Sequence, residues 1–182
     1  KVINALEVLD GTVIPGANVV VIGGGSVGWE TAIAIAAMGT ISAENAKFLL
    51  EHDAETPERI RELLKQGTHR VTLVELEKGV GRDIGISTRW VTIKCIHNLG
   101  VKVLDQHKVL AVNDEGVLVE HAGEQKLLPA DSIVLAIGAQ PENSLAAELE
   151  GKVKALELIG DAKNPRKITE AVREGFELGR II

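Results

Sequence analysis

The chain has 182 residues, of which 45% are apolar and 25% charged, and these proportions are typical of a globular protein. The net charge of −6, without a basic run, argues against a nucleic-acid partner, and no apolar run is long enough to suggest a membrane span. The single cysteine, Cys95, excludes an internal disulfide and gives no metal-binding pattern, so no metal site is predicted. No secretory signal is recognisable, and we expect a cytoplasmic protein.

The first part of the sequence alternates between expected strands and expected helices. Short apolar runs predict buried strands over 18–22, 71–75 and 101–104. Helical segments are expected over 26–38 and 87–98, and a glycine follows closely after each. Strand–helix–strand alternation of this kind is typical of a mostly parallel sheet covered by helices.

Shorter elements follow in the second half of the sequence. Turn-rich segments separate three short strands of an expected antiparallel meander, over 109–112, 117–120 and 126–128. The last expected elements are strands over 132–136 and 156–159 and a helix over 168–181. The predicted fold class is therefore α/β: a Rossmann-like parallel sheet with helices on both faces and an antiparallel β-meander crossover.

One segment, 40–68, interrupts the alternation with an expected pair of helices. Ser42 can cap a helix that runs to Glu51, and Pro57 fits the first position of a second helix. Leucine and isoleucine recur there at helical spacing, which argues against a disordered linker. We predict a two-helix insertion, which is either a surface insertion with a packed underside or a docking surface for another domain or subunit.

The strongest motif is a glycine turn between the first strand and the first helix. It has the form G-x-G-x-x-G and comprises Gly23, Gly24, Gly25, Ser26, Val27 and Gly28. Gly23 allows a tight turn, Gly25 lets the backbone approach a pyrophosphate, and Gly28 lets the helix pack close to the strand. The free N–H groups at the start of the helix favour phosphate oxygens. A strand–helix turn without a ligand is the alternative, but the flanking elements are those that a dinucleotide site requires.

An acidic residue at the end of the second strand supports this interpretation. Glu75 could accept hydrogen bonds from the adenosine ribose, and its charge would repel a 2′-phosphate. It lies 47 residues after Gly28 instead of roughly 20 because the two-helix insertion intervenes. Glu77 is a weaker candidate, and the nearby Lys78 and Arg82 leave NADP open. We expect NAD(H) to be preferred over NADP(H).

Catalytic groups are not recognisable in the chain. It has no tyrosine, and its five histidines stand without a partner carboxylate placed by the pattern. Cys95 stands in the middle of an expected helix, beside isoleucines, and is more typical of a core residue than of a nucleophile. A nucleotide site without acid–base residues suits hydride transfer from a nicotinamide to a flavin, because there the cofactors do the chemistry.

The order of motifs resembles a known family of flavoproteins. The motifs are GGGSVGWE, VELEKGVGRDIG, SIVLAIGAQP, ELIGDA and DAKNPRKITEAVREGFELGR. They are similar to the nicotinamide-nucleotide domain and C-terminal end of 2,4-dienoyl-CoA reductase, enoate reductases, NADH:flavin oxidoreductases and trimethylamine dehydrogenase. The resemblance covers nearly the whole chain except 40–68. It implies an NAD(H)-binding domain over 1–155 and the C-terminal segment of an FAD-binding domain over 156–182.

The resemblance also implies roles for residues outside the glycine turn. Glu30 matches a helix glutamate near the nicotinamide, and Gly138 matches a glycine whose backbone lies against the cofactor. Gly160 and Asp161 match the Gly-Asp motif through which the chain returns to the FAD domain, where the aspartate contacts the flavin ribityl chain. Glu30, Gly138 and Asp161 each also have a simpler interpretation, as a helix-surface acid, a turn glycine and a cap or turn residue.

Two functions follow as alternatives. The first is an enzyme fragment that positions a nicotinamide for hydride transfer to FAD in a dienoyl-CoA reductase-like or enoate reductase-like enzyme. The second is a non-catalytic ADP or nucleotide module, as in trimethylamine dehydrogenase-like proteins. The resemblance implies that the partners of the chain are the other half of the FAD domain and a catalytic barrel of the same protein. FAD is expected only in that full-length protein, where FMN and an iron–sulfur cluster also have a place. The isolated chain is not expected to be active.

Overall fold

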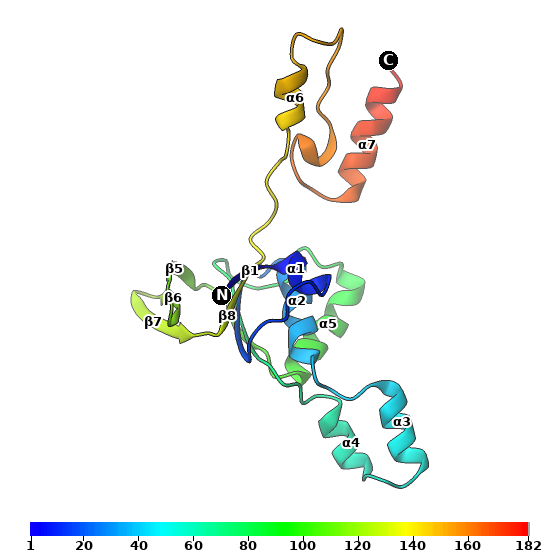
Figure 1. Ribbon diagram of the computed structural model, residues 1–182, viewed down its shortest axis with the longest axis vertical. Coiled ribbons are helices and arrows are strands. Elements are labelled where there is room, and N and C mark those ends of the chain that lie inside the picture. Colours follow the sequence, from blue (N-terminus) through cyan, green and yellow to red (C-terminus); the bar gives the residue numbers. More distant parts are fainter. Residues whose placement is uncertain (182) are drawn as a thin grey trace. The chain divides into compact units, whose positions relative to one another are not determined.

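The computed structural model describes residues 1–181 of the chain. The chain divides into two compact units, Lys1–Ile137 and Gly138–Ile182, and each is described by itself. The first unit contains the parallel sheet, the meander and the two-helix insertion, which Figure 1 shows. In the described part of the chain no helix has the length and apolar character needed to cross a membrane.

A five-stranded parallel sheet forms the centre of the first unit. Its strands lie in the order β1-β8-β2-β3-β4, and every neighbouring pair is parallel. Their bounds are β1 Val2–Asn4, β8 Ser132–Leu135, β2 Asn18–Ile22, β3 Arg70–Val74 and β4 Lys102–Leu104. The expected strands at 18–22, 71–75, 101–104 and 132–136 are confirmed within one or two residues. Since all strands run the same way, their carboxyl ends meet at one edge of the sheet.

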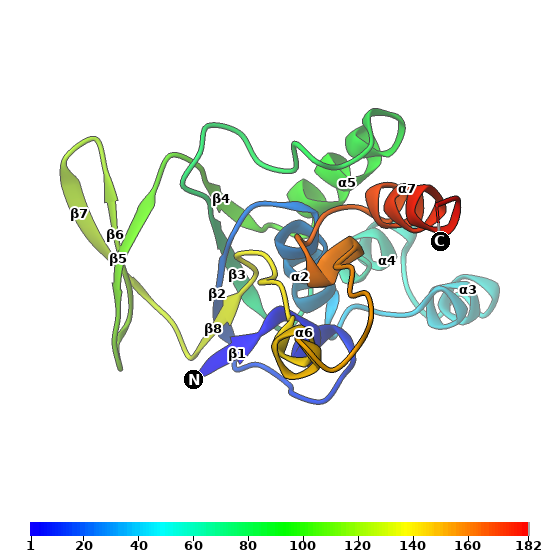
Figure 2. The same cartoon turned by 90° about the horizontal axis from the view of Figure 1, so that it is seen from above.

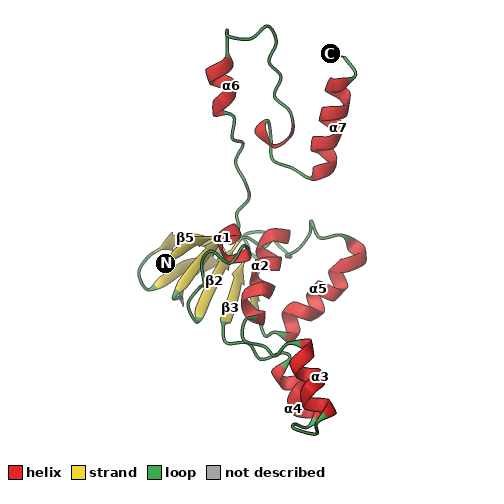
Figure 3. Ribbon diagram, turned by 45° about the vertical axis from the view of Figure 1, so that its right-hand side comes forward, coloured by secondary structure: helices red, strands yellow, loops and turns green. Residues whose placement is uncertain are grey.

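Helices cover one face of this sheet. They are α1 (Ala5–Leu9), α2 (Ser26–Ala37) and α5 (Ile86–Asn98), and Figure 3 shows α2 and α5 against the strands. Val19 and Val21 of β2 belong to the apolar cluster beneath these helices. The alternation of side chains along a strand sends the residue between them, Val20, to the opposite face.

The meander covers the other face. It consists of β5 (Lys108–Val112), β6 (Gly116–His121) and β7 (Glu124–Pro129), paired antiparallel in that order. Val117 and Val119 of β6 are fully buried in a second apolar cluster with the sheet. Figure 2 shows the meander on one side of the sheet and α2 on the other. The α/β fold class is confirmed, and in the described chain the meander takes the face for which further helices were expected.

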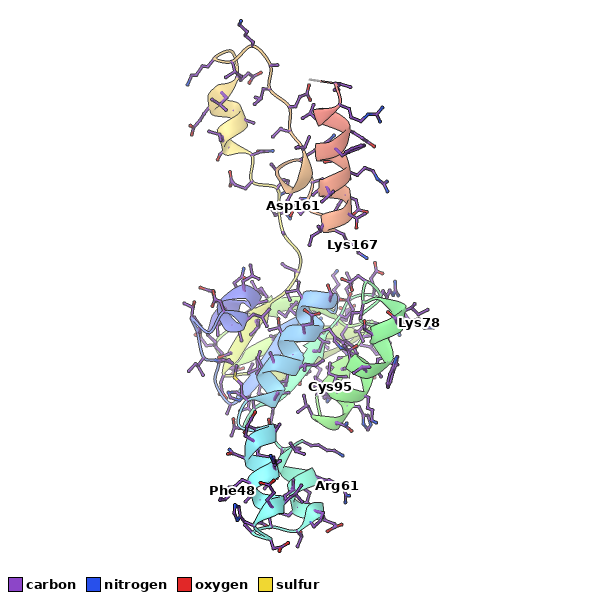
Figure 4. All side chains as sticks on the ribbon, turned by 90° about the vertical axis from the view of Figure 1, so that its right-hand side faces the viewer. Phe48, Arg61, Lys78, Cys95, Asp161 and Lys167 are labelled. Carbon is purple, nitrogen blue, oxygen red and sulfur yellow. The ribbon has the colours of Figure 1, made fainter. Side chains whose placement is uncertain are left out.

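The two-helix insertion folds as the sequence predicts. Helix α3 (Ala43–Glu51) is capped by Ser42, and α4 (Pro57–Leu63) is capped by Thr56 and begins with proline. Figure 4 marks one side chain on each helix. The chain closes at the base of the insertion, where the Thr68 N–H donates to the carbonyl oxygen of Met38 at 2.8 Å.

The second unit is built from short elements. These are α6 (Ser144–Leu149), a 3-10 turn η1 (Gly160–Ala162) and α7 (Ile168–Gly179). The strand predicted over 156–159 is wrong: the segment has no strand assignment and pairs with no strand of the described chain. A strand needs a neighbour for its backbone N–H and C=O groups, and the apolar run alone could not show whether one is present.

Candidate functional site

The glycine turn lies where β2 ends, at the carboxyl edge of the sheet. Gly23 has φ +110°, and a Cβ there would lie 2.3 Å from the carbonyl oxygen of Ala136. A Cβ on Gly28 would lie 1.8 Å from the carbonyl oxygen of Gly23. Because both obstacles are backbone atoms, the fold itself requires glycine at 23 and 28, for the tight turn and the close packing that the motif predicts.

Gly25 is a different case. Its backbone angles, φ −69° and ψ −179°, are open to any residue. The nearest atom to a Cβ at this position would be Asp83 Oδ2 at 3.5 Å, an ordinary van der Waals distance. Neither conformation nor packing within the chain requires a glycine here. A close approach of something outside the chain explains it, and this fits a cradle for a pyrophosphate.

Glu75 follows β3 and lies against the glycine turn. Its Oε2 accepts a hydrogen bond from the Gly24 N–H at 2.5 Å, and its Oε1 accepts one from the Glu77 N–H at 2.8 Å. Although the insertion separates Glu75 from the glycines in sequence, the parallel pairing of β2 with β3 brings them together. A carboxylate has about four acceptor sites, so capacity remains for the hydroxyls of a ribose.

The first two turns of α2 carry three further predicted site residues, Ser26, Val27 and Glu30. Ser26 is partly buried, Val27 is 44% exposed, and Glu30 is exposed one turn further along the helix. The structure therefore brings together the six residues of the glycine turn, with Glu30 beside them on α2 and Glu75 against Gly24. Trp29, between them, is only 3% exposed and packs in the core beneath the helices.

Sequence reasoning assigned no role to Asp83, which reaches the same place. Its Oδ2 accepts a hydrogen bond from the backbone N–H of Ser26 at 2.9 Å, at the N-terminus of α2. The bond joins positions 57 residues apart. No local pattern signals such a contact, because it depends on how the segment after β3 folds back over the glycine turn.

That segment, 76–85, is fastened by backbone hydrogen bonds. The Gly81 N–H donates to the carbonyl oxygen of Gly24 at 2.7 Å, and the Arg89 Nη2 donates to the carbonyl oxygen of Val80 at 3.1 Å. The sequence offers two cations near Glu75, Lys78 and Arg82, that could bind the 2′-phosphate of NADP. Arg82 is paired with Glu77 at 2.7 Å, and Lys78 is exposed on the segment between β3 and α5 (Figure 4).

The remaining predicted residues belong to the second unit. Gly138 has φ +95°, and a Cβ at this position would have no neighbouring atom within 4 Å, so its backbone conformation suits glycine while its surroundings are open. Gly160 has φ +61° and is followed by the exposed Asp161 in η1 (Figure 4).

A charged network holds the turn at Gly160. Glu174 Oε2 accepts from the Gly160 N–H at 2.7 Å, and Arg166 Nη2 donates to Glu174 Oε1. The Arg166 N–H in turn donates to Asp161 Oδ1 at 3.3 Å. The hydrogen bonds from Arg166 and from Gly160 lower the pKa of Glu174, and the carboxylate raises the pKa of Arg166. The network fixes the backbone on both sides of Asp161.

The rest of the described chain contains weaker candidates for a binding site. Its histidine, cysteine, aspartate and glutamate side chains form no group of three or more that could hold a metal ion. A shallow depression of about 410 Å³ is lined in part by Glu62, His69 and Asn98. It lies near the amino end of β3, whereas ligands of open parallel sheets bind at the carboxyl ends.

Comparison with known proteins gives close relatives. The chain is 45% identical over 97% of its length to the metal reductase of Desulforamulus reducens, of which it covers 26%. It is 32% identical over 88% of its length to the NADH oxidase of Thermoanaerobacter brockii, of which it covers 21%. Among solved structures, a 2-naphthoyl-CoA reductase complex matches the whole chain with a TM-score of 0.73 and 26% identity, over 23% of that protein.

The chain thus spans about a quarter of the length of these relatives. The family model of the pyridine nucleotide-disulphide oxidoreductases matches residues 3–175, which include the glycine turn, Glu75 and the Gly-Asp turn. The resemblance to flavoprotein reductases inferred from the motifs is therefore confirmed. The chain belongs to the pyridine nucleotide-disulphide oxidoreductase family.

Proposed function

We propose that the chain binds NADH at the glycine turn and positions the nicotinamide for hydride transfer to FAD in a larger flavoprotein reductase. The observation that carries the proposal is Gly25. It is a glycine that neither its backbone angles nor its neighbours in the chain require, at the N-terminus of a helix and at the carboxyl edge of a parallel sheet.

Each residue of the site has a distinct part in this proposal. The backbone N–H groups at the start of α2 hold the pyrophosphate, and the missing side chain at Gly25 lets it approach. Glu75 would accept the ribose hydroxyls, and the family resemblance assigns Glu30 and Gly138 to the nicotinamide half. The bound nicotinamide supplies the hydride, and the protein contributes position and exclusion of competing acceptors.

Discrimination between NADH and NADPH falls to Glu75 in this proposal. Its carboxylate is held by two backbone N–H groups and cannot turn away without losing both bonds. A 2′-phosphate would have to approach this fixed negative charge. Arg82, one of the two candidate cations for such a phosphate, is paired with Glu77 at 2.7 Å. The name of one relative, NADH oxidase, agrees with a preference for NADH.

We assign residues 156–182, which lie within the second unit, to the C-terminal segment of an FAD-binding domain. Asp161, held by Arg166 and the Gly160 turn, would meet the flavin there. We place the division between the two cofactor domains at 155/156 and the reductase in the dienoyl-CoA and enoate class. The relative that reduces a CoA thioester, 2-naphthoyl-CoA reductase, supports that class of substrate.

Nucleotide titration of the 182-residue chain tests the site. Gly25→Val should abolish NAD⁺ binding and leave the fold intact, since the valine fills the approach of the pyrophosphate. Gly85→Val is the matched control: Gly85 also precedes a helix, with φ −54° and with its nearest neighbour at 3.7 Å. Wild-type protein should bind NAD⁺ at least about tenfold more tightly than NADP⁺. This ratio corresponds to a difference of about 1.4 kcal/mol in the free energy of binding. Unchanged affinity in Gly25→Val, as measured by calorimetry, would refute the site.

Rapid mixing of the full-length protein with NADH separates the proposed role from a structural nucleotide module. Flavin absorbance should bleach within the turnover time of the enzyme, and Gly25→Val should slow that bleaching. If the nucleotide binds and the flavin stays oxidised, the module is structural and the proposed hydride transfer is wrong.

A further inference from the structure

The N-terminus of α2 lacks a cap of its own. Helices α1, α3 and α4 are each capped by the side chain of their N-cap residue. The N-cap of α2 is Gly25, which has no side chain, and the first turn of α2 contains no acidic residue. The free N–H groups and the partial positive charge of this helix end therefore need an acceptor from elsewhere.

Asp83 supplies that acceptor. Its Oδ2 lies 2.9 Å from the Ser26 nitrogen and 3.5 Å from the point that a Cβ on Gly25 would occupy. The carboxylate thus lies over the part of the turn that the missing side chain of Gly25 leaves open. A phosphate oxygen drawn to the Ser26 N–H would need the same place.

We propose that Asp83 competes with the pyrophosphate of the nucleotide for the N-terminus of α2 and so sets the affinity of the site. This inference rests on the proposed function, because it assumes that the glycine turn receives a pyrophosphate. Two anions cannot both take one backbone N–H at close range without repulsion. Binding therefore includes the cost of moving the carboxylate of Asp83 away.

The displacement needs only the side chain to move. The backbone just before Asp83 is fastened, through Gly81 to Gly24 and through Val80 to the Arg89 side chain, and just after it the Ile84 N–H donates to the carbonyl oxygen of Gly81 at 3.3 Å. Asp83 itself is exposed, so water can reach its carboxylate when a nucleotide displaces it from the Ser26 N–H. The backbone of segment 76–85 stays in place, and so does Glu75, which is held by the N–H groups of Gly24 and Glu77.

Competition has a signature that a purely structural cap lacks. In Asp83→Asn the side chain keeps an oxygen that accepts from the Ser26 N–H but loses its charge. The nucleotide-free chain should then become slightly less stable, because the charge–dipole attraction is lost. The affinity for NAD⁺ should rise about tenfold, because the competing anion is gone. A structural cap would lower stability and affinity together.

The experiment is calorimetric titration of the 182-residue chain with NAD⁺ and with adenosine, for wild type, Asp83→Asn and Asp10→Asn. Asp10 is the matched control, since its Oδ1 accepts from the Thr12 N–H at the same 2.9 Å on a different loop. We expect tighter NAD⁺ binding only in Asp83→Asn. Adenosine, which has no phosphate, should bind equally to all three proteins. Thermal unfolding of the three nucleotide-free proteins then measures the expected slight loss of stability in Asp83→Asn.

Failure of this inference can be told from failure of the site. If wild type binds NAD⁺ and Asp83→Asn binds it equally or more weakly, the competition is refuted and the nucleotide site stands. If neither protein binds NAD⁺, the proposed function is refuted and the competition with it. Equal tightening for adenosine would also refute the competition, because the effect would then not concern phosphate.

Discussion

The two units of the chain differ in how they bury apolar side chains. The first unit holds all twenty-two buried hydrophobic residues identified in the described chain: twenty in the two clusters on the faces of the sheet, and Ala46 and Ile60 in the two-helix insertion. In the second unit Gly160 is the one described residue that is buried. Helix α7 nevertheless has an apolar stripe, Ile168, Val172 and Phe176, at a spacing of four residues, and each of the three is at least 65% exposed.

The difference shows what holds each unit. Burial of apolar surface stabilises a fold by about 25 cal/mol per Å², and it must offset the loss of about 1–2 kcal/mol of backbone entropy per residue. In the first unit, the apolar surface buried on both faces of the sheet offsets this loss of entropy. The second unit has mainly a hydrogen-bond network at Gly160, Arg166 and Glu174. An apolar stripe on such a helix is typical of an element whose partner is another part of the protein.

The largest expected effect comes from separating the units. A chain that ends at Ile137 should keep cooperative thermal unfolding and dispersed amide resonances, because its core lies entirely within 1–137. The peptide 138–182 should show neither, since it buries too little apolar surface to offset its entropy. Cooperative unfolding of the isolated peptide 138–182 would show that the second unit folds without the first, against the difference in burial between the two units.

Local sequence signals predicted the parts of the fold that local chemistry decides. The glycines at 23 and 28 are required by backbone atoms close to them, and the caps Ser42 and Thr56 act within three residues. Glu75 could be predicted despite the insertion, because a strand-end acid next to a glycine turn follows from parallel pairing. Its hydrogen bond to Gly24 agrees with that expectation.

Contacts that depend on the surroundings could not be predicted in the same way. The apolar run 156–159 looks like a strand, but whether it becomes one depends on a neighbour. The three-residue β1 and the short helices α1 and α6 are too brief for a periodic signal. Asp83 reaches α2 through a segment whose path is set by hydrogen bonds to Gly24, and no spacing rule describes that path.

A smaller effect is expected from single glycines of the first unit. Gly28→Ala should destabilise it by about 3 kcal/mol, because its Cβ would lie 1.8 Å from a backbone oxygen that cannot move freely. Gly25→Ala should cost no more than about 1 kcal/mol, the usual range for a change at a helix N-cap. Denaturant unfolding of the 182-residue chain measures both. Similar losses in the two variants would mean that Gly25 is also a packing residue.

The smallest expected effect is an acid transition in the second unit. The hydrogen bonds from Arg166 and Gly160 lower the pKa of Glu174 below the ordinary value of 4.5. A carboxylate with a depressed pKa in the folded state stabilises that state above the ordinary value, and this contribution is lost as the pH falls through the folded pKa. The change is small because the pair is in contact with solvent, which weakens ion pairs.

The Gly160 amide reports this transition, because its N–H donates to Glu174 at 2.7 Å. Its chemical shift, followed by NMR in the 182-residue chain, should stay constant at neutral pH and change only below 4.5. In Glu174→Gln the amide keeps an acceptor and the acid-dependent change should disappear. The first unit serves as the internal reference, since its core amides should not respond over the same range. A Gly160 transition centred at or above 4.5 would mean that the network does not favour the charged carboxylate. The charged network would then stabilise the second unit less than its comparison with the first unit assumes.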